Sequence, residues 1–256
     1  MPEPGTELEN ALRLAVDAGE VMMQSGGEIT RVEDTIGHIG RAFGARRVDA
    51  WATPTGFIVT GEDADGHTYT ILRRVQATGN NLTAVAEVNE LSRRAFQGNL
   101  DLVAARAALS AIIEAPPPYS PLVIVLSAAV ASASFAYLLG SPLRNLGAAA
   151  LTGLIVQAVS FLVDRLGWGG FARSWAGGMT AAACALALHA INSEIGVNWV
   201  IIGSIMTLVP GLAITNALRE IMGGQLVSGV TRSVDALATA VGVAAGVGLV
   251  LGLGVR

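Results

Sequence analysis

The stretch IMTLVPGLAITNALRE, residues 205–220, joins a helix break to charged side chains inside a long apolar run. Pro210 has no backbone N–H, so we expect the carbonyl of Met206, four residues earlier, to lose its partner and the helix to bend. Free carbonyls at such a break can accept from an ammonium group. The N–H groups that open the second half-helix, from Gly211 on, carry partial positive charge and suit a carboxylate. Discontinuous helices of this kind bind zwitterionic and anionic solutes in secondary transporters.

The half-helix after the break is two-sided. Its polar side holds Thr215, Asn216, Arg219 and Glu220, and its apolar side holds Ile214, Leu218 and Ile221. A polar side on a membrane helix predicts a partner helix or a solute pathway. The alternative, a simple proline kink with Arg219 and Glu220 marking the inner interface, stays open.

The chain that carries this stretch has the composition of a membrane protein. Of its 256 residues 52 % are hydrophobic, and the mean hydropathy is +0.55, too apolar for an ordinary soluble protein. A transmembrane helix needs about 20 mainly apolar residues. Five segments meet that need within a few residues: 119–139, 146–163, 174–191, 199–218 and 233–254. The sequence therefore predicts a membrane body over 119–256.

Charge separates this body from a soluble head at residues 1–118. Sixteen of the 20 acidic residues lie in the head, which also carries ten arginines; the chain has no lysine. With the head inside, the inner loops hold Arg165, Arg173, Arg219 and Arg232, and the outer side holds Arg144 and Arg256. The positive-inside rule then favours a cytoplasmic head. The acidic start MPEPGTELEN lacks the pattern of a signal peptide, which also favours a cytoplasmic head. We expect a multi-pass protein of the plasma (inner) membrane.

The head itself has the pattern of an α+β domain with the order ααβββαα. Helical periodicity covers 7–24, 28–43, 81–97 and 99–115, whereas 46–62 and 67–75 are rich in β-formers, with a turn near Pro54. The run Pro116–Pro118 predicts a stiff, non-helical spacer before the membrane body.

The last apolar segment carries a stripe of small residues. Ala238, Gly242 and Gly246 repeat every four residues, which permits close helix approach in lipid. Asp235 and Thr239 continue the stripe. A packing seam explains the glycines, but an acid so near a membrane span usually has a partner or a task.

Several separated motifs resemble the threonine/serine exporter family. The long motif LVPGLAITNALREIMGGQLVSGVTRSVDAL is similar to its membrane signature, and AGEVMMQSGGEITRVEDTI, TPTGFIVT and VNELSRRAFQG resemble its amino-terminal blocks. The resemblance selects, in the membrane body, Pro210, Gly211, Asn216, Arg219, Glu220, Ser228, Gly229, Arg232 and Asp235. In the head it selects Gly26, Glu28, Arg31, Glu33, Thr53, Pro54, Thr55, Gly56 and Arg93.

Two departures from the family pattern matter. Family members more often carry Asp where this chain has Glu220, so the carboxylate reaches further here. Full-length members also continue into a second hydrophobic half, whereas this sequence ends at Arg256. It is therefore similar to the split form, which implies a small membrane subunit as partner. Split members are associated with dicarboxylate export (succinate-like), and fused members with threonine and serine.

The resemblance implies a secondary exporter of a small carboxylate-bearing metabolite, without a cofactor or a bound metal. The phosphate-binding loop G-x-x-x-x-G-K-[ST] is absent, so nucleotide does not drive the cycle from within this chain. Proton coupling is expected, because burial raises a carboxyl pKa and lets Glu220 or Asp235 load and release a proton near neutral pH. A homo-oligomer stays open, and nothing suggests nucleic acid.

The head residues allow two interpretations. Glu28, Arg31 and Glu33 surround one helix start, which suits capping and helical ion pairs. Alternatively, Arg31 and Arg93 bind carboxylates at a cytoplasmic gate or collecting surface. Thr53 and Thr55 belong to a strand-breaking turn.

Two rival functions remain. A membrane hydrolase is disfavoured, because G-x-S-x-G and H-E-x-x-H are absent and His38, His67 and His189 fall in unrelated segments. The single cysteine, Cys184, predicts a free thiol packed between helices. The second rival is a scaffold or regulatory subunit that leaves the pathway to the partner; the broken helix argues against it.

Overall fold

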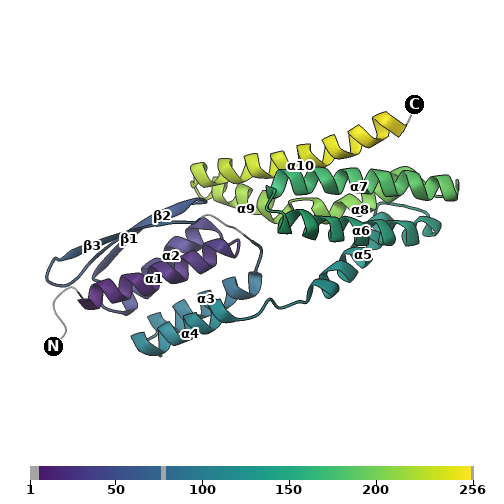
Figure 1. Ribbon diagram of the computed structural model, residues 1–256. Coiled ribbons are helices and arrows are strands. Elements are labelled where there is room, and N and C mark those ends of the chain that lie inside the picture. Colours follow the sequence, from purple (N-terminus) through teal and green to yellow (C-terminus); the bar gives the residue numbers. More distant parts are fainter. Residues whose placement is uncertain (1–5, 76–78, 255–256) are drawn as a thin grey trace. The chain divides into compact units, whose positions relative to one another are not determined.

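The computed structural model describes residues 6–75 and 79–254, and it is mainly helical (Figure 1). Arg256, one of the two arginines predicted on the outer side, lies outside the described residues. The chain forms two compact units. The head unit contains Met1–Pro118 together with Thr215–Arg232, and the membrane unit contains Tyr119–Ile214 together with Ser233–Arg256. The segment 215–232, which the sequence places in the membrane body, thus packs within the head unit.

The element order of the head confirms the predicted α+β class, ααβββαα. The elements are α1 (Thr6–Gln24), α2 (Ile29–Ala42), β1 (Arg47–Thr53), β2 (Gly56–Glu62), β3 (Thr68–Arg74), α3 (Leu82–Phe96) and α4 (Leu102–Glu114). The strands form an antiparallel sheet in the order β1-β2-β3. Thr53 pairs with Gly56, so Pro54 and Thr55 make the two-residue turn that the sequence indicates. Asn81 and Asp101 accept hydrogen bonds from the first turns of α3 and α4 and so fix where these helices begin.

Helices α1 and α2 pack over one face of the sheet, and α3 and α4 lie beyond them (Figure 1). The core between α1, α2 and the strands is built from fully buried side chains such as Leu12, Ile36 and Val59. Gly61 permits this contact, because a Cβ there would lie 2.6 Å from the Leu12 side chain. The apolar periodicity of the sequence therefore selects the core face of each element.

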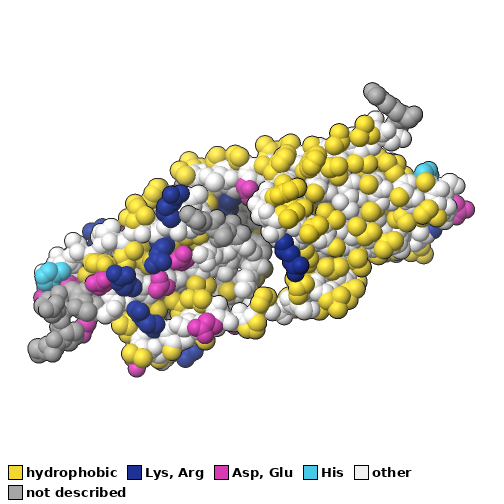
Figure 2. All heavy atoms as spheres, viewed as in Figure 1, with side chains coloured by type: hydrophobic (Ala, Val, Ile, Leu, Met, Phe, Trp, Pro, Cys, Tyr) yellow, Lys and Arg dark blue, Asp and Glu magenta, His cyan; other side chains and the backbone are white. Residues whose placement is uncertain are grey.

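The membrane unit is built on long apolar helices: α5 (Pro121–Leu138), α6 (Leu146–Arg165), α7 (Gly169–Ile191) and most of α10 (Leu226–Gly254). Each is long and apolar enough to cross a bilayer. A further pair of helices, α8 (Val197–Ile205) with its 3₁₀ extension and α9 (Gly211–Met222), passes the same test together but is bent by 54°. The described residues thus provide four spans, or five if the broken pair is one. Hydrophobic side chains spread over the visible face of this unit, whereas charged side chains gather on the head unit (Figure 2).

Small residues set the helix spacing inside the membrane unit. A Cβ on Gly246 of α10 would lie 2.2 Å from the carbonyl oxygen of Trp175 on α7, and one on Gly242 would lie 3.1 Å from that of Phe171. A Cβ on Gly153 of α6 would collide with Ser132 of α5. Because lipid supplies little hydrophobic force between helices, such close backbone contact is what holds them together.

Candidate functional site

The break between α8 and α9 is ordered and tightly turned. Residues Met206–Leu208 form a 3₁₀ turn, and the N–H of Val209 donates to the Met206 carbonyl at 3.3 Å. The missing N–H of Pro210 predicts that this carbonyl is left without a partner; the 3₁₀ turn supplies one, because it shifts the donor from position 210 to 209. Helix α9 then begins at Gly211, directly after Pro210. The predicted break and bend are present.

Helix α9 buries two residues of its polar side, Asn216 and Glu220, and exposes its apolar side. Asn216 is 5 % exposed and Glu220 is 2 % exposed, whereas Ile214, Leu218 and Ile221 are exposed. A helix of a soluble protein shows the reverse arrangement. The described residues that receive the buried polar side chains belong to the amino-terminal part of the chain, within the same head unit.

Two glycines between α1 and α2 form the receiving surface. Gly26 has φ +87°, and a Cβ there would lie 2.7 Å from the carbonyl oxygen of Gly79. A Cβ on Gly27 would lie 2.7 Å from Cγ of Met22. Both positions therefore need glycine, and both carbonyls accept hydrogen bonds: Nδ2 of Asn216 donates to Gly26 O at 3.3 Å, and Nη2 of Arg232 donates to Gly27 O at 2.8 Å.

Glu220 caps α2 from a distance in the sequence. Glu28 occupies the N-cap position of α2 but makes no side-chain cap bond, and the N–H of Ile29 donates instead to Oε1 of Glu220 at 3.2 Å. A carboxylate at this place satisfies a free helix N–H and lies at the positive end of the helix dipole. Nε of Arg232 lies 2.9 Å from the same Oε1, close enough for an ion pair but misaligned for a hydrogen bond.

Glu28 pairs instead with Arg219, whose side chain is 59 % exposed. Next to it, Glu33 Oε2 accepts from Nε2 of Gln225 at 3.1 Å, and Glu33 Oε1 accepts from the N–H of Ala52 on β1 at 2.9 Å. Burial raises the pKa of the Glu33 carboxyl above its ordinary range, although the Ala52 N–H opposes the shift. The glycine-rich turn and α2 are therefore joined to the segment 215–232 by one ion pair, Glu28–Arg219, and by several hydrogen bonds, while the Glu220–Arg232 ion pair lies within that segment.

The start of α10 closes this arrangement. Ser228 is buried, and a Cβ on Gly229 would lie 2.5 Å from the Ile221 side chain and 2.9 Å from the carbonyl oxygen of Ala217. Gly229 thus lets α10 approach α9 closely, which holds Arg232 beside Glu220.

Other predicted residues lie apart from this cluster. Arg31 is exposed on α2, and Arg93 on α3 pairs with Glu90 at 2.7 Å. Thr53 and Thr55 contact each other across the β1–β2 turn. Thr215 is exposed on α9, and Asp235 is exposed on α10 in the membrane unit.

Gln225 and the backbone groups of Gly27 and Ile29 also belong to this cluster, although they are not among the predicted site residues. Gln225 follows a pair of glycines between two apolar helices, and a lone amide at such a place is the only sequence signal it gives. The backbone groups carry no sequence signal beyond the two glycines themselves.

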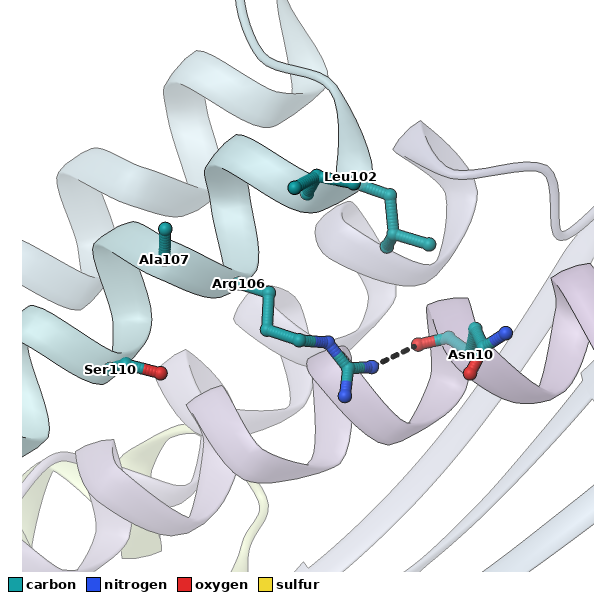
Figure 3. A pocket seen from close by; sticks show the side chains of 6 residues that line it. Asn10, Leu102, Arg106, Ala107 and Ser110 are labelled. Atoms are coloured by element: carbon teal, nitrogen blue, oxygen red, sulfur yellow. Dashed lines mark hydrogen bonds between the residues drawn. The ribbon is translucent and has the colours of Figure 1, made fainter.

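Two other features of the head unit involve none of the predicted residues. An open hollow of about 460 Å³ lies between α1 and α4, where Nη2 of Arg106 donates to the Asn10 carbonyl at 3.4 Å (Figure 3). In the β2–β3 turn, side-chain atoms of Asp63, Asp65 and His67 lie within 4.8 Å of one another. There Oδ1 of Asp63 accepts from the N–H groups of both neighbours at 2.9 Å, which accounts for the turn.

The comparisons with known proteins agree with the motifs. A family model described as "Putative threonine/serine exporter" matches residues 13–254. A protein of Mycobacterium tuberculosis named "Probable threonine/serine exporter" is 25 % identical over 237 residues, which cover 92 % of this chain and 45 % of that protein. The chain thus spans less than half the length of this relative. No solved structure matches this chain. With a family match over nearly its whole length and a set of membrane-spanning helices, this chain belongs to the threonine/serine exporter family of transporters and is a multi-pass membrane protein.

Proposed function

We propose that this chain is the head-bearing half of a secondary transporter that exports a small carboxylate-bearing metabolite from the cytoplasm. The solute is threonine or serine, or a dicarboxylate such as succinate. Family membership supports transport, and the name of the relative supports an exported amino acid.

The observation that carries this proposal is the broken helix pair α8–α9. Its two halves are bent by 54° at Pro210, and the first turn of α9 lies at the positive end of the helix dipole, which suits a carboxylate, while the Gly211 N–H itself donates to the Val209 carbonyl at 2.8 Å. A break of this kind inside a membrane is tolerated where it is buried in protein or lines a wet cavity. The proposed solute site is therefore at Pro210 and Gly211, with the polar side of α9 following it.

The rest of the proposal concerns energy, partner and orientation. A proton gradient drives export. A second membrane segment, equivalent to the part of the relative that this chain does not cover, completes the transporter as a separate subunit. The head faces the cytoplasm, in agreement with the arginines of the inner loops.

A second candidate function is a scaffold or regulatory subunit, whose partner would hold the whole pathway. It is favoured by one finding: Asn216, Arg219, Glu220 and Arg232 all bond to the head segment at residues 26–29. Polar side chains engaged in this way are suited to transmit movement between α9 and the head.

Efflux from preloaded cells separates the two functions. Labelled threonine and labelled succinate would each be followed with the chain alone, with the candidate membrane partner alone, and with both. Asn216→Ala removes the bond to Gly26, and Thr231→Ala serves as control because this exposed hydroxyl donates to the Val227 carbonyl of its own helix.

The exporter proposal expects efflux with both components, loss of most flux in Asn216→Ala with unchanged membrane abundance, and normal flux in Thr231→Ala. Flux from the partner alone, unchanged by Asn216→Ala in the pair, would assign the pathway to the partner and this chain to the second function.

A further inference from the structure

Glu220 has one carboxylate oxygen whose hydrogen-bonding capacity is unused. Its side chain is 1 % exposed. Oε1 accepts from Ile29 N–H and faces Arg232, but Oε2 is buried and has no hydrogen-bond partner among the described residues. Buried polar atoms of native proteins nearly always have partners, so an unsatisfied carboxylate oxygen indicates a missing donor.

The carboxylate is fixed in orientation. The first N–H of α2 and the guanidinium of Arg232 are both on the side of Oε1, which leaves Oε2 as the oxygen that points away from the donors. A side chain held in this way is preorganised, because binding at Oε2 costs no rotation of the carboxylate.

Other acceptors surround the same guanidinium. Arg232 contacts the carbonyl oxygen of Gly27 with Nη2 and Oε1 of Glu220 with Nε, so both acceptors lie within the span of one side chain. The side-chain amide of Asn216 donates to the adjacent carbonyl oxygen of Gly26. Each carbonyl oxygen has a second lone pair. Oε2 itself is a carboxylate oxygen, which only accepts hydrogen bonds, so it suits a group that donates.

An ammonium group has three donors and no acceptor, whereas an ionised dicarboxylate brings acceptors only. We propose that Oε2 of Glu220 binds the protonated amine of the transported solute at a second position on its pathway, about 13 Å along α9 from the carboxylate position at the start of that helix, which makes Glu220 the residue that selects amino acids over dicarboxylates. This inference rests on the proposed export function and narrows its substrate class.

Glu220→Gln tests the inference with little change in packing. The amide oxygen of glutamine faces Ile29 N–H and Arg232, since both are donors, and the NH₂ group then takes the place of Oε2. The variant keeps the contacts of Oε1 but presents donors to the ammonium group. It should accept a solute in which a hydroxyl replaces the amine.

The solutes to compare are threonine and its deaminated analogue 2,3-dihydroxybutanoate, together with succinate. Efflux would be measured for the chain with its membrane partner, and binding of labelled threonine would be measured on the purified full chain. Glu114→Gln, the same chemical change at an exposed carboxylate, is the control.

In the wild type and in Glu114→Gln, threonine should be preferred over the analogue. In Glu220→Gln that preference should fall at least about tenfold, which corresponds to about 1.4 kcal/mol, while handling of the analogue is kept or improved. A variant that retains the wild-type preference would overturn the inference, as would equal losses for both solutes, because equal losses indicate a structural role alone.

The two proposals fail in different ways. Threonine efflux that does not depend on the charge of Glu220 leaves the export function standing and removes the amine site. Threonine binding that is lost in Glu220→Gln, without efflux from any combination of subunits, supports the amine site and removes the export function. Absence of threonine binding to the wild-type chain counts against the amine site.

Discussion

Replacing Arg232 by methionine should loosen the first turn of α2. The Arg232 side chain is 15 % exposed; its guanidinium donates to Gly27 O at 2.8 Å and lies 2.9 Å from the buried Glu220 carboxylate. Methionine fills a similar volume but leaves that carboxylate without its counter-charge. Breaking a buried ion pair from one side costs about 3–5 kcal/mol. We expect the opening free energy of this turn to fall by that amount.

Amide hydrogen exchange, followed by mass spectrometry on peptides from residues 27–36 of the full chain in detergent, measures this opening directly. Arg219→Met is the matched control: it removes the ion pair of the same segment with Glu28, but its side chain is 59 % exposed. Arg219→Met should lower the opening free energy of the first turn of α2 by no more than about 1 kcal/mol.

A second variant makes the test specific to the charge pair. In Arg232→Met combined with Glu220→Leu, no charge is left buried, so the double variant should be more protected than Arg232→Met alone. Equal exchange in Arg232→Met and Arg219→Met, or strictly additive effects in the double variant, would refute the assignment of Glu220 and Arg232 as a buried coupled pair.

Three further predictions concern pH, helix packing and topology. Burial raises the pKa of Glu33 above its ordinary value of 4.5, so the folded state keeps this proton to higher pH than the unfolded chain does; the free energy of unfolding should fall as pH rises from 4.5 through the folded pKa, and Glu33→Gln should flatten that slope in thermal melts at several pH values. An identical slope in wild type and variant would contradict this. Gly246→Ala places a Cβ 2.2 Å from a carbonyl oxygen of α7 and should destabilise the membrane unit by about 1–3 kcal/mol, whereas Gly248→Ala, with nothing within 4 Å, should be close to neutral; equal melting temperatures in detergent would argue against the α7–α10 contact. With Cys184 replaced by alanine, a cysteine at exposed Asp49 should react with an impermeant maleimide only when the cytoplasmic side is accessible, and labelling of intact cells would reverse the proposed orientation.

The sequence was sufficient for those parts of the fold that depend on local patterns. The burial of Leu12 on α1 and of Ile36 on α2 follows from helical periodicity, and the break at Pro210 follows from the missing N–H. The 3₁₀ turn that satisfies the Met206 carbonyl did not follow, because several backbone adjustments can resolve a proline break.

The pairing of the head with the segment 215–232 was beyond local reasoning. Asn216 and Gly26 are 190 positions apart, and periodicity gives no information on contacts at that separation. Glu28 and Glu220 are both predicted as charged site residues, but which of the two carboxylates caps α2 depends on tertiary structure. The motif resemblance marked both segments without indicating that they meet.

The distance between these segments along the chain has a consequence for biosynthesis. A ribosome completes residues 1–118 long before it reaches residue 215, and about 100 residues of membrane helices are made in between. Because domains fold as their parts emerge, the nascent head must wait with the first turn of α2 uncapped and its two glycine carbonyls open to solvent. Only the last spans deliver Glu220 and Arg232. Completion of the head therefore reports that the broken helix and the start of α10 have been made, and a chain arrested before that point carries an unfinished head that chaperones and proteases can recognise.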